Sequence, residues 1–472
     1  MRMYVTRTMA AVMLAAVFAT PAMAAQKKSK TMKAATAPKL SVAPIQYRSR
    51  VLPNGLEVYS VVDHSTPTVA IQVWYRVGSK NDPEGRSGFA HLFEHMMFKS
   101  TKNMASEMLD RLTEDVGGWN NASTFDDSTP YFEVVPSNYL ETLLWAEAER
   151  MGSLTVDEGN FKSEREVVKE EFRFRILAPP YGRFWYAMEQ NSFAVHPYRR
   201  PGIGSIEDLD AATIDDVRAF HRTFYRPDNA VLIVVGDLDQ AQFDGWVDKY
   251  FTSIAKPSTP IPQVTAKEPA RKMEKRVPVT APNVPLPAIG MTWLAPAASS
   301  KDADALQVAA ALLARGESSR LHQSLVYKQE IAQEVEAHAD LRADLGLFGT
   351  LAIMSSDHTA ESGEKALRAE IKKLADRPVA AAELEKAKSL LITDSLRERE
   401  TNSGKAFAIG QAIILERDAA QVNKGLARLQ AVTTADIQRV VRKYLVEGKP
   451  VVITYTSEPE PKSEAPAKGE GK

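Results

Sequence analysis

Two histidines and a glutamate stand close together in an otherwise apolar segment. Residues 87–98 read Ser-Gly-Phe-Ala-His-Leu-Phe-Glu-His-Met-Met-Phe, which predicts a buried helix carrying His91, Glu94 and His95. The two histidines are four residues apart, so both imidazoles lie on one helical face, where one metal ion can bind both. This H-x-x-E-H pattern inverts the commoner H-E-x-x-H zinc motif. The alternative is two core histidines and a buried glutamate with local partners, because without a metal or other partners these groups would be costly in so apolar a helix.

A catalytic zinc ion needs a third protein ligand and an open position for water. Residues 163–174 predict a helix on which Glu164 and Glu171, seven residues apart, both fall near the centre of an apolar arc. One of the two carboxylates would bind the metal and the other would orient a ligand, but the spacing does not choose between them. The apolar arc comprises Val167, Val168, Phe172 and Phe174, and the polar side carries Glu166, Lys169, Glu170 and Arg173.

Composition excludes several other classes of site. The 472 residues are 44% hydrophobic and 25% charged, which is typical of a globular protein with room for two to four domains. With 59 Lys and Arg against 60 Asp and Glu, the chain is no polycation and no nucleic-acid partner is expected. Cysteine is absent, so disulfides, thiolate nucleophiles and cysteine metal sites are excluded. A metal site must use histidine and carboxylate ligands.

The ends of the chain and a proline-rich stretch predict its organisation. Arg2 and Arg7 precede an apolar stretch at 8–20, and small residues around Ala24 offer a cleavage site, as in a secretory signal peptide. No later segment is long and apolar enough to span a bilayer. We predict a signal peptide at 1–24, a flexible lead-in at 25–46, a metal-binding domain at 47–256, a linker at 257–284, a homologous non-metal domain at 285–457 and a disordered tail at 458–472. An edge strand could already begin within the linker, at 273–279.

An internal repeat relates the two large domains. Residues 209–233 align without gaps on residues 429–453, 220 positions later, with identities that include Leu209/Leu429, Thr213/Thr433 and Arg222/Arg442. Each copy predicts a helix capped by threonine, a short turn and a buried strand. Two unrelated helix–strand units are the alternative. Duplication is favoured, which predicts an α+β fold with two homologous α/β sandwich domains.

These residues resemble a known family. H-x-x-E-H, followed at 164–171 by Glu-Arg-x-x-Val-x-x-Glu, is similar to the pitrilysin/insulinase inverzincin metallopeptidases, and most of all to the branch of the mitochondrial processing peptidase and its bacterial relatives. The resemblance continues through Leu52–Leu56, Gly117–Ala122, His196–Tyr198, Tyr225–Pro227 and Gly236–Asp237. It implies one Zn²⁺ per chain on His91, His95 and Glu171, with Glu94 as general base and Glu164 as a supporting carboxylate. It also implies two homologous halves that face each other across a chamber.

A hairpin is expected to hold the substrate. Residues 119–125 and 129–135 predict two strands around Asp126-Asp127-Ser128, and an exposed edge there could pair with an extended peptide. Spacing alone equally allows an ordinary surface hairpin. The resemblance places peptide backbone against Asn121 and Ala122, with Thr124 beside them, and so favours substrate binding.

The second domain departs from the family pattern. Relatives usually carry an Arg and, seven residues later, a Tyr that reaches the substrate, but Val326 and Gln333 stand at these positions, with Tyr327 one residue out of register. The chain therefore resembles a zinc-bearing subunit whose Arg/Tyr pair comes from a homologous subunit. The alternative is an active monomer or homodimer in which the pair is dispensable.

The function expected from these observations is zinc-dependent hydrolysis of peptides or small unfolded polypeptides. The signal peptide predicts export to the periplasm of a Gram-negative bacterium, with secretion as a further possibility. The alternatives are a non-catalytic core subunit of a heteromeric assembly and a peptide-binding subunit that captures without cutting.

Overall fold

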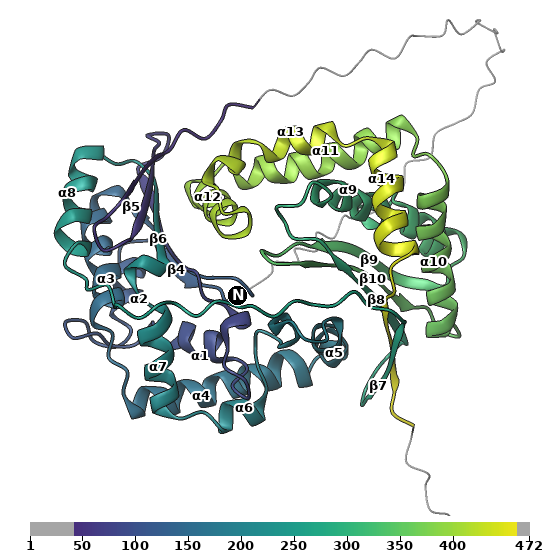
Figure 1. Cartoon of the computed structure of the whole chain (residues 1–472), viewed down its shortest axis with the longest axis horizontal. Coiled ribbons are helices and arrows are strands. Elements are labelled where there is room, and N and C mark those ends of the chain that lie inside the picture. Colours follow the sequence, from purple (N-terminus) through teal and green to yellow (C-terminus); the bar gives the residue numbers. More distant parts are fainter. Residues whose placement is uncertain (1–41, 460–472) are drawn as a thin grey trace, which may run out of the picture. The chain divides into compact units, whose positions relative to one another are not determined.

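A computed structural model describes residues 42–459. The predicted signal peptide, most of the lead-in and nearly all of the tail lie outside this range. Within it the chain builds two mixed sheets of the same design (Figure 1). No helix of the described residues is long and apolar enough to cross a membrane.

The first sheet has the strand order β1-β2-β6-β3-β5-β4, and the second has the order β7-β11-β8-β10-β9. Apart from β1 the two orders correspond strand for strand, and in each sheet one pair, β2 with β6 and β7 with β11, is parallel. The strands are β1 Arg48–Val51, β2 Glu57–Val62, β3 Thr68–Tyr75, β4 Trp119–Ala122, β5 Thr129–Pro136, β6 Ala230–Gly236, β7 Lys275–Ala281, β8 Ala288–Ala295, β9 Ala332–Asp340, β10 Gly346–Met354 and β11 Val451–Ser457.

Most helices of the first half have a counterpart in the second half. The first half contains α1 Phe89–Met96, α2 Met108–Glu114, α3 Leu140–Ser153, α4 Glu158–Phe172, α5 Gly182–Ser192, α6 Ile206–Asp210, α7 Ile214–Phe224 and α8 Gln240–Phe251. The second contains α9 Ala303–Ala314, α10 Ala360–Asp376, α11 Ala381–Glu398, α12 Asn402–Glu416, α13 Gly425–Ala431 and α14 Thr434–Val440. Short helical turns include η1 Ser79–Asn81, η3 Arg173–Leu177, η4 Pro197–Arg199, η6 His322–Lys328 and η8 Val441–Val446.

The 220-residue offset of the repeat extends far beyond the segment that predicted it. Strand β3 and helices α3 and α7 begin at 68, 140 and 214, and their counterparts β8, α10 and α14 begin at 288, 360 and 434. Thr213 and Thr433 cap α7 and α14 through equivalent capping boxes with Asp216 and Asp436. The two halves are therefore homologous α+β sandwiches, as the repeat predicts.

Each half lends one helix to the sheet of the other half. Helix α12 of the second half buries Ala406, Ile409 and Ile413 against Trp74 and Ile233 of the first sheet. Helix α5 of the first half buries Phe184 and Met188 against Ala288 and Ile453 of the second sheet. Figure 1 shows α12 beside the first sheet and α5 beside β8. The halves are thus joined by a reciprocal exchange of helices.

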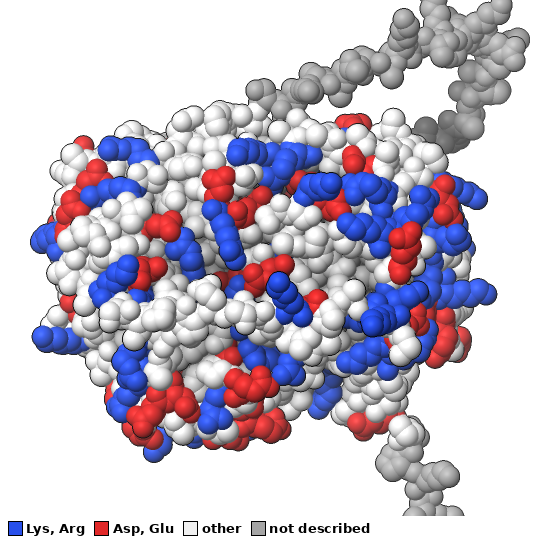
Figure 2. Space-filling model, in the orientation of Figure 1, with Lys and Arg blue, Asp and Glu red and all other residues white. Residues whose placement is uncertain are grey.

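Strand β7 lies inside the stretch predicted as linker. It forms the edge of the second sheet and pairs in parallel with β11, so an edge strand does occur close to residues 273–279. Between α8 and β7, within the described residues, the chain forms no helix or strand. Figure 2 shows Lys and Arg interspersed with Asp and Glu over the face of the molecule in view, consistent with the near balance of charge.

Candidate metal centre

Helix α1 carries the two histidines, and a buried aspartate fixes its first turn. Gly88 precedes the helix with φ of 90°, and a Cβ there would lie 2.9 Å from the carbonyl oxygen of Ile203, so glycine is required. The Asp82 carboxylate accepts the N–H groups of Gly88 and Ala90, both at 2.8 Å. These bonds satisfy donors that have no partner within the helix. The result is a rigid start for the helix that holds the site.

Three donor atoms from α1 and α4 converge. Nε2 of His91 lies 3.5 Å and Nε2 of His95 lies 3.4 Å from Oε2 of Glu171. Ligand-capable atoms of these three residues all lie within 4.8 Å of one another, and no other such group of histidine and acidic residues occurs in the part of the chain that the structure describes. Two imidazoles and one carboxylate form the His₂Glu donor set of catalytic zinc sites. The residues therefore fit a zinc ion.

The second carboxylate of α4 lies on the other side of His95. Oε2 of Glu164 is 3.5 Å from Nδ1 of His95, and its Oε1 is 2.9 Å from Nζ of Lys99. Nη2 of Arg175 forms an ion pair with Oε1 of Glu171 at 2.6 Å. A histidine that offers one ring nitrogen to a metal usually donates the other to a carboxylate, which is the position that Glu164 occupies. Lys99 was not anticipated from the sequence, because nothing in its spacing marks it as a partner of α4.

The protonation of the three donors follows from their surroundings. Burial lowers the pKa of His91 to about 4, and the nearby His95 adds to that effect, so His91 is neutral at pH 7. Burial alone would lower the pKa of His95, but hydrogen bonds to Glu164 and Glu171 raise it to about 9. Burial alone would raise the pKa of Glu171, but the hydrogen bond from His95 and the charges of neighbouring cations lower it to about 2. A neutral imidazole and an ionised carboxylate are metal-binding forms, and a metal ion would displace the proton of His95.

Glu94 stands beside this group and is held by the hairpin. Its Oε2 accepts a hydrogen bond of 2.5 Å from the hydroxyl of Thr124. Burial raises the pKa of the Glu94 carboxyl, and the bond from Thr124 partly offsets that rise. The structure therefore brings together all four residues of the H-x-x-E-H…Glu set, with the non-ligand carboxylate fixed by a residue that follows β4.

The predicted hairpin is confirmed. Strands β4 and β5 pair antiparallel, with Asn121 opposite Phe132 and Ala122 opposite Tyr131, and β4 forms the edge of the first sheet. Strand β4 ends at Ala122, earlier than predicted, because Phe125 N–H closes the turn on the carbonyl of Ser128 at 2.9 Å. At this edge Asn121 is exposed and Ala122 is buried.

The apolar arc predicted for α4 is half wrong. Val168 and Phe172 are buried as expected, together with Phe161, but Val167 and Phe174 are 45% and 77% exposed. Phe174 lies in the π-helical turn η3, whose wider spacing rotates side chains away from the α-helical register. Lys169, predicted on the polar side, is largely buried and is paired with Asp210 at 2.7 Å. Val326 lies in η6 and Gln333 in β9, both in the second half.

Two family profiles match the chain. Residues 57–174 match the insulinase family, Peptidase M16, and residues 211–391 match the Peptidase M16 inactive domain. The first match contains the metal centre, and the second covers much of the half without it.

Known proteins agree with these matches. The zinc protease PqqE of Helicobacter pylori is 31% identical over 410 residues, which are 86% of this chain and 92% of that protein. The probable mitochondrial-processing peptidase subunit beta of Arabidopsis thaliana is 26% identical over 85% of this chain and 76% of its own length. The crystal structure of a protease from Helicobacter pylori has a TM-score of 0.84 at 31% identity, covering 88% of this chain and all of that one. A peptidase M16 inactive domain from Pseudomonas fluorescens shares the fold alone, with a TM-score of 0.78 at 16% identity over 88% of this chain and 98% of that one. The chain belongs to the insulinase-like M16 peptidase family, in which its relatives include named zinc proteases.

Proposed function

We propose that this protein is a zinc-dependent endopeptidase that cleaves peptides or small unfolded polypeptides. The observation that carries the proposal is the convergence of His91, His95 and Glu171 with the ionisable carboxyl of Glu94 beside them. Relatives named as zinc proteases support the same chemistry.

Each residue of the site has a distinct role in the proposal. One zinc ion on the His91, His95 and Glu171 donors would supply a Lewis acid that polarises a peptide carbonyl and acidifies water. Glu94 takes the proton of the attacking water at its carboxylate and then passes it to the departing amine. Thr124 fixes the position of that carboxylate through its hydroxyl. Glu164 orients the ring of His95.

The edge of the first sheet is the proposed binding site for the peptide. An extended substrate added beside β4 would form main-chain hydrogen bonds at Asn121 and Ala122, which requires little of its sequence. Thr124 lies two residues beyond Ala122 and donates a hydrogen bond to Glu94, so a peptide in this position passes the general base. This arrangement suits unfolded substrates, because folded chains rarely expose free backbone.

A homologous subunit is proposed to complete the site. Val326 and Gln333 supply neither the guanidinium nor the phenol that relatives carry at these positions. We therefore favour a heterodimer in which a partner provides them, over a homodimer without them. The leader at 1–24 supports export to the periplasm, where the supply of unfolded peptide would suit such an enzyme.

The decisive experiment combines turnover with metal content. The purified chain is incubated with a quenched fluorescent peptide library, and bound zinc is quantified in the wild type and in Glu94→Gln, His91→Ala and Glu170→Gln. Glu94→Gln should keep stoichiometric zinc and lose about a thousandfold in turnover, the scale of general-base catalysis. His91→Ala should lose both metal and turnover. Glu170→Gln is the matched control, since its carboxylate is exposed on the same helix beside Glu171.

The outcomes separate the candidate functions. Retained turnover in Glu94→Gln would refute its role as the base. If the wild type binds stoichiometric zinc but does not cleave peptides, the protein is either part of an obligate heteromer or a peptide-binding subunit. Addition of homologous subunits distinguishes these two.

A further inference from the structure

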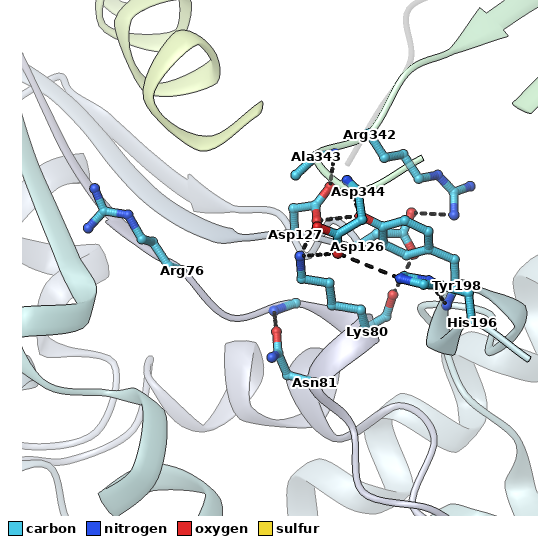
Figure 3. Close-up of polar contacts among 12 residues, drawn as sticks. Arg76, Lys80, Asn81, Asp126, Asp127, His196, Tyr198, Arg342, Ala343 and Asp344 are labelled. Carbon is cyan, nitrogen blue, oxygen red and sulfur yellow. Dashed lines mark hydrogen bonds and ion pairs between the residues drawn. The ribbon is translucent and has the colours of Figure 1, made fainter. Parts of the chain in front are cut away.

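The turn between β9 and β10 in the second half contacts the tip of the β4–β5 hairpin in the first half. The N–H of Ala343 donates to Oδ2 of Asp127 at 3.0 Å, and Nη1 of Arg342 lies 3.1 Å from Oδ2 of Asp126. Arg342 is anchored on its own side by Asp340, at 2.6 and 2.9 Å. Figure 3 shows Arg342, Ala343 and Asp344 approaching the two hairpin aspartates.

Two further side chains close this contact into a network. Nζ of Lys80 bridges Asp127, at 2.7 Å, and Asp344, at 3.0 Å. The hydroxyl of Tyr198 donates to Asp127 at 2.6 Å and accepts the N–H of Asp344 at 3.3 Å. The guanidinium of Arg342 lies over the ring of Tyr198, with its central carbon 4.9 Å from the ring centroid. We call Lys80, Asp126, Asp127, Tyr198, Arg342, Ala343 and Asp344 the clasp.

Burial makes the geometry of the clasp well defined. Asp127 and Tyr198 are only 6% and 1% exposed, and both carboxylate oxygens of Asp127 are engaged. A buried carboxylate left without its partners would carry a large desolvation cost, and Asp127 has Lys80 and Tyr198 as partners in the first half and the N–H of Ala343 in the second. The hairpin tip therefore has one favoured position.

The hairpin tip leads directly to the proposed general base. The N–H of Ser79 donates to the carbonyl of Phe125 at 3.1 Å, and the N–H of Lys80 donates to that of Asp126 at 3.2 Å. A Cβ on Gly78 would lie 2.1 Å from the carbonyl of Phe125, so only glycine permits this close approach. Thr124, which immediately precedes Phe125, donates to Glu94. The segment with Lys80 also continues to Asp82, which holds the start of α1.

We propose that the β9–β10 turn of the second half is a positioning element for Glu94, acting through the hairpin and Thr124. The inference rests on the proposed function, because it assigns Glu94 the role of base. Helices α5 and α12 already join the halves elsewhere, so the clasp is not needed merely to hold them together. Its place at the hairpin beside Glu94 gives the half without metal donors a part in the reaction.

The test is a double-mutant cycle with separate kcat and KM values. Arg342→Ala should lower kcat about tenfold, because small misplacements of a catalytic group reduce rate steeply. KM should change less than twofold and bound zinc should be unchanged, since neither β4 nor the donor set is altered. Arg342→Lys should restore part of kcat. Arg320→Ala is the matched control: it removes a guanidinium bidentate to Glu383 within the second half and should leave kcat unchanged.

The route through Thr124 is tested by combination. If the clasp acts through this hydroxyl, Arg342→Ala combined with Thr124→Val should have the same kcat as Thr124→Val alone. If the clasp has a purely structural role, the losses in kcat of the two single variants should add in the double variant and should parallel the decreases in melting temperature. Asp344→Asn serves as the second variant if Arg342→Ala fails to fold, because it preserves shape and removes only the charge opposite Lys80.

Hydrogen exchange supplies a readout that does not depend on activity. Amides of the hairpin tip, residues 123–128, should exchange faster in Arg342→Ala than in Arg320→Ala, without bound peptide. An active wild type whose Arg342→Ala variant keeps both kcat and hairpin protection would overturn this inference alone. A zinc-loaded wild type without turnover, alone or with homologous subunits, would overturn the proposed function and this inference together.

Discussion

The two halves have the same strand order, yet only one carries metal donors. Helix α1 buries two imidazoles and a glutamate among apolar residues, whereas α9, Ala303–Ala314, is built almost wholly of alanine, leucine and valine and buries nine of its residues. Both helices pack against a long helix that follows, α4 or α11. The second half thus has the same fold without metal donors. The metal centre therefore depends on a few side chains of the first half and not on the scaffold that both halves share.

A pair of equivalent aspartates shows the same divergence in electrostatics. Asp82 precedes α1, and Asp302, 220 residues later, precedes α9; both are nearly inaccessible. Burial raises the pKa of Asp82 to about 7, because only N–H groups and the distant Arg200 oppose it. Burial acts on Asp302 too, but hydrogen bonds from Arg439, Lys443 and Tyr444 outweigh it and lower the pKa to about 2. One half thus has a carboxyl with a raised pKa at the helix of the metal donors, where the other has an ion-pair cluster.

The substitution with the largest expected effect disturbs the packing of α12 on the first sheet. A Cβ on Gly410 of α12 would lie 2.3 Å from the ring of Trp74, so Gly410→Ala should lower the free energy of unfolding by about 3 kcal/mol. In an open helical position the same change stabilises. Gly245 of α8 has nothing within 4 Å, so Gly245→Ala should raise the free energy of unfolding by about 0.5–1 kcal/mol. Urea titrations of both variants check this opposition in sign, and a stabilising Gly410→Ala would contradict the packing of α12 on the first sheet.

The next largest effect is expected in the ion-pair cluster of the second half, around Asp302. Asp302 has a folded pKa of about 2 against 3.8 when unpaired, so its contribution is present above pH 3.8 and is lost as the pH falls through 2. Asp302→Asn should therefore lower the free energy of unfolding by about 2 kcal/mol at pH 7. The difference from wild type should shrink between pH 4 and pH 2 in acid titrations. A constant difference over that range would rule out ionisation as its source.

The third prediction concerns the equivalent position in the first half, and its sign is opposite. Asp82 has a folded pKa of about 7, so its contribution to stability is complete below pH 3.8 and is lost as the pH rises through 7. Wild-type stability should fall over this window with a slope of up to about 1.4 kcal/mol per pH unit from this group. Asp82→Asn, which cannot ionise, should reduce that slope. Denaturation at pH 4, 5.5 and 7 measures it, and parallel profiles would show that Asp82 is ionised throughout.

Local spacing allowed His91 and His95 to be placed from the sequence, the family resemblance chose Glu171 over Glu164 as third donor, and the repeat allowed the two homologous halves to be predicted. The i, i+4 pair His91 and His95 faces α4, and the hairpin occurs around Asp126-Asp127-Ser128, because both depend on neighbours in sequence. Phe174 was misplaced because a π-helical turn interrupts the register that the 3.6-residue period assumes, whereas Val167 lies on the exposed side of α4 itself.

Long-range partners could not be predicted in the same way. The apolar faces of α5 and α12 would look the same whichever sheet covered them, so the exchange leaves no mark in either helix. The clasp joins residues that lie far apart in the chain, and although Tyr198 belongs to the matched segment His196–Tyr198, nothing in the sequence pairs it with Asp344 or Lys80. Lys99 beside Glu164 is a similar case, because the lysine lies on a loop after α1 and only tertiary packing brings it to α4.

The exchanged helices also constrain the order in which the chain can fold during synthesis. When the first half has left the ribosome, one face of its sheet still lacks α12, because that helix begins only at Asn402. The apolar residues Trp74, Val231 and Ile233 therefore stay uncovered by α12 while more than 160 further residues after Gly236 are synthesised. Contacts so distant in sequence slow folding and leave apolar surface open to aggregation. Maturation of the metal-binding half is thus coupled to the completion of the whole chain, and neither half is an independent folding unit.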